Sequence, residues 1–145
     1  MSKLFHIITD GSCDLPPEWA KQKGYSVVPF YVSFDDTHYF KEIEEMGIRD
    51  FYQQMVDRKG VYPKSSMPST QDYVDAFMPW VEQNIPVICI CITTKFSGSL
   101  QSAMNAMQMI REERPKARIE VIDSTVDTVL QGILVLEAVK CQESG

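Results

Sequence analysis

Short apolar segments alternate with longer segments of helical pattern along this chain, and this alternation restricts the fold more than any other feature. The apolar segments are rich in β-branched residues and are predicted to be strands, at residues 4–9, 25–34, 86–93 and 118–123. Near-continuous apolar strands separated by helices are typical of a parallel sheet that is covered on both faces. The sequence therefore predicts an α/β fold, a three-layer sandwich with a mainly parallel four-stranded sheet flanked by helices.

Capping residues and apolar spacing place the helices between these strands. Asp14 is expected to cap a first helix that ends at Gly24. Ser69 and Asp72 form a capping-box pattern at the start of a third helix. Residues 48–59, 99–114 and 126–141 are predicted to be further helices, residues 38–40 a short hairpin arm, and residues 61–68 a loop.

Length and charge exclude several classes of protein. The 145 residues fit one domain, and 14 Lys and Arg against 20 Asp and Glu give a formal net charge of −6. Because phosphates and anionic lipids need a basic surface, binding to nucleic acid or to an anionic membrane is not expected. No apolar run approaches the roughly 18 residues of a membrane span, and the first residues lack a signal-peptide layout. We therefore expect a cytoplasmic protein.

Neither the cysteines nor the aspartates form a recognisable metal pattern. Cys89 and Cys91 lie two apart in an apolar strand, where they are expected to be small buried hydrophobic side chains. Asp10, Asp14 and Asp123 are an alternative metal cluster, but helix caps and turns account for each of them more simply. The sequence predicts no metal site and no cofactor.

The predicted strands are followed by loops that are rich in hydroxyl groups. Ligands of an open parallel sheet bind outside the carboxyl ends of its strands, so these loops, together with residues 64–69, form the candidate site. Ser97 and Gly98 lie where a strand leads into a helix, and free N–H groups at a helix start attract anions. Gly98 also lets a ligand approach the backbone closely. An ordinary helix cap without a ligand is the alternative for Ser97.

The residues needed for serine catalysis are not found in the right places. A serine nucleophile needs a base and an orienting group. His6 is predicted inside the first strand and His38 in the hairpin arm, away from the serine loops. The sequence also lacks Gly-x-Ser-x-Gly, the Walker pattern and Gly-x-Gly-x-x-Gly. These absences favour binding over catalysis, so the protein is not expected to be an enzyme.

Four motifs lie in order along nearly the whole chain, at residues 8–16, 64–69, 96–103 and 121–124. Together they resemble the motifs of the DegV family of bacterial fatty-acid-binding proteins. Residues 8–16 resemble the "TDSTSDLP" of that family and residues 64–69 its "TSQPS". Residues 96–103 resemble "LSGTYQSA", and residues 121–124 resemble "VIDS". The resemblance implies that a long-chain fatty acid binds between two domains, with its acyl chain in an apolar tunnel. It also implies that a separate fatty acid kinase receives the fatty acid.

The resemblance assigns roles to particular serines. The threonine of "TSQPS" falls on Ser65 and the serine of "LSG" on Ser97, so these two residues, with Gly98, are expected to bind the fatty-acid carboxylate. The other loop hydroxyls are expected to support the site, at Ser12, Ser66 and Ser124.

The chain also departs from the family pattern. Serine replaces threonine at Ser65, Gly11 replaces a serine, and Leu130 replaces the first glycine of "SxGxG". Residues 1–145 correspond to the N-terminal domain alone, so we expect the C-terminal domain to be absent and the open groove to favour self-association. The alternative is a phosphotransferase domain that resembles the dihydroxyacetone kinase subunits, which would require His6 or His38 at the serine loops.

Overall fold

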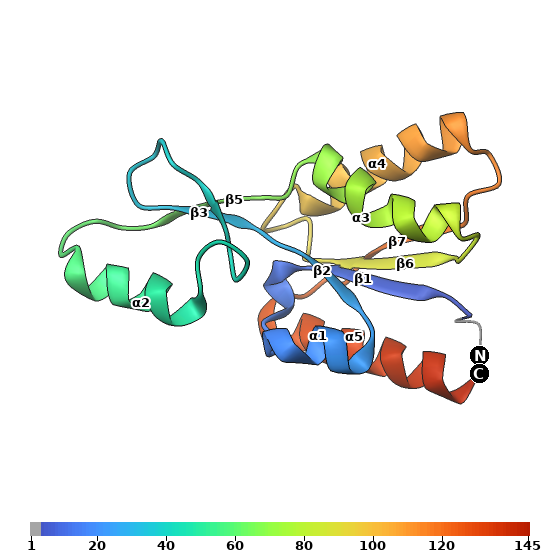
Figure 1. Cartoon of the computed structure of the whole chain (residues 1–145), viewed down its shortest axis with the longest axis horizontal. Helices are drawn as coiled ribbons and strands as arrows, with labels where there is room; N and C mark the ends of the chain where they lie inside the picture. Colours follow the sequence, from blue (N-terminus) through green and yellow to red (C-terminus); the bar gives the residue numbers. More distant parts are fainter. Residues whose placement is uncertain (1–3) are drawn as a thin grey trace.

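The computed structural model describes residues 4–145, and a parallel sheet forms its centre. The four strands lie in the order β2-β1-β6-β7, and every neighbouring pair is parallel (Figure 1). They are β1 (His6–Asp10), β2 (Ser26–Val28), β6 (Val87–Cys91) and β7 (Ile119–Asp123). The predicted parallel α/β sheet is confirmed.

Helices cover both faces of this sheet, as the sequence predicts. They are α1 (Pro17–Lys23), α3 (Thr70–Glu82), α4 (Ser99–Glu113) and α5 (Thr128–Ser144). Figure 1 shows α3 and α4 on one face and α1 and α5 on the other. Because successive strand residues point to opposite faces, Ile8 joins the core under α3 and α4, while Ile7 joins the core under α1 and α5. The sheet is therefore the middle layer of a three-layer sandwich.

A separate antiparallel unit, which we call the arm, extends from this sandwich (Figure 1). Three strands in the order β4-β3-β5 form its sheet. The arm consists of β3 (Tyr31–Ser33), β4 (Phe40–Lys41), α2 (Ile48–Asp57) and β5 (Lys64–Ser66). The hairpin predicted at residues 38–40 corresponds to the pairing of β3 with β4.

The arm corrects two predictions. Residues 25–34 are not one strand, because β2 ends at Val28 and the chain leaves the parallel sheet at Pro29, which has no N–H to donate. Residues 61–68 are not all loop, because residues 64–66 pair with β3. β5 contains no apolar residue, so only its pairing with a distant segment defines it as a strand.

Helix starts confirm one capping prediction and correct another. Ser69 Oγ accepts from Asp72 N at 3.1 Å and Ser69 N donates to Asp72 Oδ2 at 2.7 Å, which completes the capping box. Asp14 does not cap α1, whose N-cap is Pro16 and has no side-chain cap. Asp14 instead adopts a left-handed φ of 49° after the short 3₁₀ helix η1 (Gly11–Cys13). Pro17 restricts Pro16, the residue before it, to an extended conformation, so the helix begins only beyond Pro16.

Between residues 4 and 145, no helix combines the length and the apolar character that crossing a membrane requires.

Candidate functional site

The carboxyl ends of β1, β6 and β7 lie at one edge of the sheet, because these strands are parallel. Ser12 follows β1, Ser97 follows β6 and Ser124 follows β7. The structure therefore places these three predicted serines in the loops of one edge. Ser65 lies in β5 of the arm, immediately before the segment that leads into α3.

The turn before α4 is built to present polar groups. α4 has Gly98 as its N-cap and no capping side chain there, while Ser97 Oγ accepts a hydrogen bond from Ser99 N at 3.1 Å. Since Ser97 Oγ is the acceptor in that bond, its own hydrogen can be donated outward. Ser97 is half-buried and Gly98 is exposed. The arrangement offers a hydroxyl and a helix start of partial positive charge to an anion.

Met67 brings the segment after β5 against this turn. A Cβ added to Gly98 would lie only 2.9 Å from Met67 Sδ, so the methionine side chain occupies the space that glycine leaves. Ser65 and Ser66 are both exposed, and they pair with Val32 and Tyr31 of β3. Because they are consecutive strand residues, their side chains face opposite sides of the arm sheet. Only one of them can therefore point toward a given ligand.

Behind the turn lies a buried carboxylate that accepts four hydrogen bonds. Asp10 Oδ2 accepts from Ile92 N at 3.0 Å and from Ser99 Oγ at 2.9 Å. Asp10 Oδ1 accepts from Ser12 N at 3.2 Å and from Gln131 Nε2 at 2.9 Å. Burial raises the pKa of Asp10 above its ordinary value, and the four donors oppose that rise. Asp10 thus connects the ends of β1 and β6 with the starts of α4 and α5.

Two further buried side chains complete this network. Tyr73 OH lies 2.6 Å from Ser99 Oγ, which joins α3 to the start of α4. Gln131 Nε2 also donates to Thr9 Oγ1 at 3.0 Å, while Gln131 Oε1 is buried without a hydrogen-bond partner. Gly132 lets α5 approach this closely, because a Cβ there would lie 2.5 Å from the backbone oxygen of Cys13.

Sequence reasoning did not find Tyr73 or Gln131. Gln131 carries a usable signal, since it is a lone polar residue among the apolar side chains of residues 129–136, and a polar residue in such a run is often buried with partners. Tyr73 carries none, because an aromatic residue at helical spacing predicts core packing and not a hydrogen bond.

The supporting serines have different surroundings. Ser12 is half-buried, and its backbone N–H is donated to Asp10. Ser124 is buried, and its hydroxyl donates to Val126 O at 2.9 Å. That bond engages the hydroxyl hydrogen of Ser124 in the turn between β7 and α5. Any support that Ser124 gives to a ligand therefore comes from shaping this turn.

Glu42 fills the space that a side chain at Gly11 would occupy. A Cβ on Gly11 would lie 1.6 Å from Glu42 Oε1, which accepts from Phe30 N at 3.0 Å. Burial raises the pKa of Glu42, and the nearby carboxylates of Asp14 and Asp10 raise it further. Gly11, which replaces a serine of the family pattern, therefore leaves space that the Glu42 carboxylate of the arm fills.

An apolar cleft of about 640 Å³ lies beside Gly11, between α1 and the arm. Most of its walls are aliphatic or aromatic, with carboxylates at Asp14, Glu42 and Glu44. The lining includes Leu15 and many further apolar side chains, among them Val27, Ile43, Ile48, Phe51 and Tyr52. The cleft supplies an apolar surface close to the carboxyl edge of the sheet.

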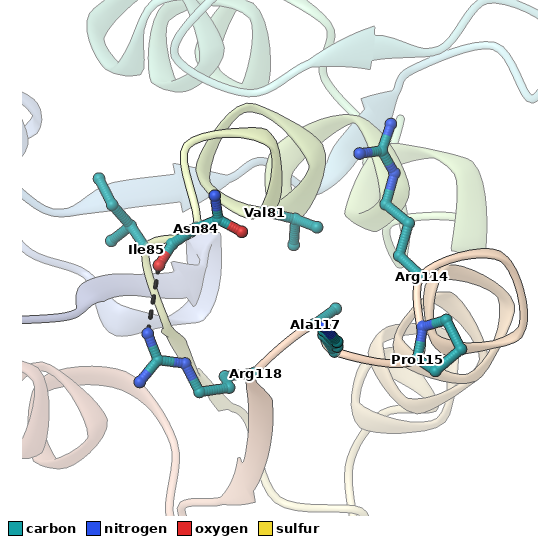
Figure 2. A pocket seen from close by; sticks show the side chains of 8 residues that line it. Val81, Asn84, Ile85, Arg114, Pro115, Ala117 and Arg118 are labelled. Carbon is teal, nitrogen blue, oxygen red and sulfur yellow. Dashed lines mark hydrogen bonds between the residues drawn. The ribbon is translucent and has the colours of Figure 1, made fainter.

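A second hollow, of about 370 Å³, lies at the opposite edge of the sheet, between the loops that precede β6 and β7. Figure 2 shows Arg114 and Arg118 on different sides of its opening. Arg118 donates to Asn84 O at 3.2 Å, and Arg114 pairs with Glu82 at 3.6 Å. Both guanidinium groups thus hold neighbouring loops, and neither is near the serine turn.

The histidines lie away from the serine turn. His6 begins β1, at the other end of the strand from Asp10, and its ring stacks on Trp80 with centroids 3.5 Å apart. His38 lies in the exposed β3–β4 connection, with Nδ1 2.7 Å from Asp35 Oδ2. The phosphotransferase alternative required a histidine at the serine loops, so the structure does not support it.

No metal cluster is present in the part of the chain from residue 4 onward. Asp10, Asp14 and Asp123 do not gather into a group of metal ligands, and no other three His, Cys, Asp or Glu side chains do so among these residues. Cys89 and Cys91 are fully buried under α3 and α4, with their Sγ atoms 3.6 Å apart.

Solved structures resemble this fold closely. A crystal structure of a stearic acid-binding protein from Eubacterium ventriosum is 41% identical, with a TM-score of 0.93 over 97% of this chain and 48% of that one. A fatty-acid-binding DegV family protein from Thermus thermophilus is 30% identical, with a TM-score of 0.82 over 97% of this chain and 48% of that one.

Sequence comparison gives the same family. A DegV domain-containing protein from Caldanaerobacter subterraneus is 34% identical over 139 residues, which are 96% of this chain and 47% of that protein. The chain thus spans about half the length of the relatives that it matches. A family model described as "Uncharacterised protein, DegV family" matches residues 4–145. Because that match covers nearly every residue, the chain belongs to the DegV family.

Proposed function

We propose that this chain forms one half of a protein that binds a long-chain fatty acid without catalysing a reaction. Ser97 and the N–H groups at the start of α4 bind the fatty-acid carboxylate, with Gly98 allowing its approach. Ser65 donates from the arm, and Ser12, Ser66 and Ser124 support the site. The neighbours from Eubacterium ventriosum and Thermus thermophilus, described as fatty-acid-binding proteins, support the choice of ligand.

One observation carries this proposal more than any other. The Met67 side chain lies against Gly98, so the segment that follows Ser65 meets the helix start that follows Ser97. Two loops rich in hydroxyl groups, from separate parts of the chain, therefore meet at a helix N-terminus that has no capping side chain on its N-cap residue. Such a place attracts an anion without needing lysine or arginine.

The acyl chain must supply most of the binding free energy. Two hydroxyl hydrogen bonds to a charged group contribute about 1.5–3 kcal/mol each, whereas every one of the many methylenes that a long acyl chain buries contributes about 0.8 kcal/mol. The apolar cleft beside Gly11 offers a surface for part of this chain. We propose that a second domain, in the half of its relatives that this chain does not span, covers the remainder.

The wider role follows from the same proposal. A fatty acid held by its carboxylate at the edge of the protein is positioned for transfer to a separate enzyme. We infer that a cytoplasmic fatty acid kinase is that partner. A pull-down of the kinase by the lipid-loaded protein, compared with the lipid-free protein, tests this step.

The direct test is mass spectrometry of lipid extracted from the purified complete gene product that contains this chain. A long-chain fatty acid present at close to one per protein supports the proposal. Recovery of no fatty acid, combined with no binding of added palmitate or stearate, would contradict it.

A further inference from the structure

We propose that Asp10 and Ser99 form a positioning pair, which fixes the turn at Ser97 and Gly98 from behind so that Ser97 can hold the carboxylate. This inference rests on the proposed function and adds to it a group that never touches the ligand. Asp10 and Ser99 are both fully buried, so neither can contact a fatty acid at the exposed side of the turn.

Ser99 is held through both its side chain and its backbone. Its Oγ donates to Asp10 Oδ2 at 2.9 Å and meets Tyr73 OH at 2.6 Å. Its backbone N–H donates to Ser97 Oγ at 3.1 Å. The side-chain hydrogen bonds therefore hold in place the residue whose backbone N–H donates to the Ser97 hydroxyl.

The chemistry of Asp10 suits this role. Two of its four partners are backbone N–H groups, from Ser12 and Ile92, which can only donate. A carboxylate is the one short side chain that offers two acceptor oxygens and no donor. Asp10 thus aligns the loops after β1 and β6 with the start of α4, and its hydrogen bonds set the distance between them.

Electrostatics separates this role from direct attraction. A buried negative charge behind the turn disfavours a second negative charge in front of it. Asp10 therefore promotes ligand binding by holding the turn in place, although its negative charge opposes the binding of an anion. For this reason the pair is recognised by loss of affinity when the link to Ser99 is cut, and not by loss of charge.

The experiment compares two buried hydroxyls of the same network in the complete gene product. Ser99→Ala removes the link between Asp10 and the turn, whereas Thr9→Val removes a hydroxyl that bonds Gln131 and Ile90 O but not residue 99. The dissociation constant of a fluorescent long-chain fatty acid and the urea unfolding midpoint are measured for each variant. We expect affinity to fall at least about fivefold in Ser99→Ala and less than about twofold in Thr9→Val, for similar changes in midpoint.

A double-mutant cycle tests whether Asp10 acts through Ser99. Asp10→Ala should weaken binding in the wild-type background and add little in the Ser99→Ala background. Additive losses would overturn the pair, as would wild-type affinity in Ser99→Ala or an equal loss in Thr9→Val. If Asp10→Ala does not fold, Tyr73→Phe takes its place, because it removes one hydrogen-bond partner of Ser99 Oγ. Tyr73→Phe should weaken binding by a smaller factor than Ser99→Ala, and unchanged affinity would count against the pair.

Amide hydrogen exchange measures how firmly the turn at Ser97 and Gly98 is held when no lipid is present. The N–H of residue 99 should exchange faster in Ser99→Ala than in the wild type and should be unchanged in Thr9→Val. Absence of fatty-acid binding by the wild-type protein would contradict the proposed function alone. Unchanged exchange in Ser99→Ala would contradict the positioning pair alone.

Discussion

The side chain of Met67 lies in the space above Gly98, where a Cβ would come within 2.9 Å of the methionine Sδ. This contact joins the end of the arm to the start of α4, although about 30 residues separate the two segments along the chain. It makes the site dependent on the absence of a side chain at one position.

Gly98→Ala should therefore weaken fatty-acid binding without unfolding the protein. The φ of −81° at Gly98 suits alanine, so the effect arises from displacement of Met67 and not from backbone strain. We expect a five- to tenfold loss of affinity, of the order of 1 kcal/mol, by fluorescent fatty-acid titration.

Met67→Ala provides the matched control for that variant. It opens the space that the added methyl group at position 98 needs, so Gly98→Ala combined with Met67→Ala should recover most of the affinity lost in Gly98→Ala. A double variant as weak as Gly98→Ala would show that the contact does not explain the effect.

Ser65→Ala combined with Ser97→Ala should weaken binding at least tenfold in the complete gene product. A hydrogen bond to a charged group contributes about 1.5–3 kcal/mol, so the loss of two outweighs the water that replaces them. Ser144→Ala, at the far end of α5, serves as the control and should bind as the wild type does. Full lipid retention by the double variant would reject these roles.

Glu42→Gln should stabilise the protein near neutral pH. Burial raises the pKa of Glu42 above its ordinary 4.5, so the folded state holds the proton more tightly than the unfolded state. The stability that this proton provides is fully present below pH 4.5 and is lost as the pH rises through the raised pKa. Glutamine keeps an acceptor for Phe30 N and carries no charge to bury.

Urea unfolding midpoints at pH 4 and pH 7 check this effect. The midpoint of Glu42→Gln should exceed that of the wild type at pH 7, and the difference should shrink at pH 4. Glu44→Gln, at an exposed position of the same cleft, should change little at either pH. Equal midpoints for Glu42→Gln and the wild type at pH 7 would argue against a buried charge.

The 145-residue chain on its own should bind fatty acid weakly and should self-associate. Ten of the 18 exposed large hydrophobic side chains in the described residues lie between residues 39 and 67, in or beside the arm. Four of them follow one another along α2, at Ile48, Tyr52, Met55 and Val56. A soluble monomer rarely leaves such a surface uncovered.

Sedimentation velocity at several concentrations measures this association. Tyr52→Lys combined with Val56→Glu should shift the chain toward the monomer, whereas Gln53→Glu, on the same helix, should not. Tight fatty-acid binding by the isolated chain, equal to that of a two-domain protein, would show that the second domain is unnecessary.

The sequence was sufficient to predict the parallel sheet, its flanking helices and the family. Those features depend on local patterns, because apolar β-branched segments such as Val87–Cys91 differ clearly from the amphipathic segments between them. The Ser69 capping box was predictable for the same reason, since both partners lie within one helical turn.

The arm and the buried network were not predictable in the same way. β5 consists of Lys64, Ser65 and Ser66, and it is a strand only because β3 pairs with it. The role of Asp10 depends on partners far along the chain, which no local pattern reveals. Pro29 was a usable signal that the predicted strand at residues 25–34 is interrupted, but the apolar residues on both sides of it favoured a single strand.

The network around Asp10 also sets when the site can form during synthesis. The partners of Asp10 at Ile92, Ser99 and Gln131 lie 82, 89 and 121 residues away from it in the sequence. The hydrogen bonds of Asp10, at the end of β1, therefore remain incomplete until α5 has emerged from the ribosome, and contacts of such long separation slow folding. A nascent chain that ends before residue 131 leaves the Asp10 carboxylate without one of its donors, so the support of the turn before α4 is complete only after nearly all of these 145 residues have been translated.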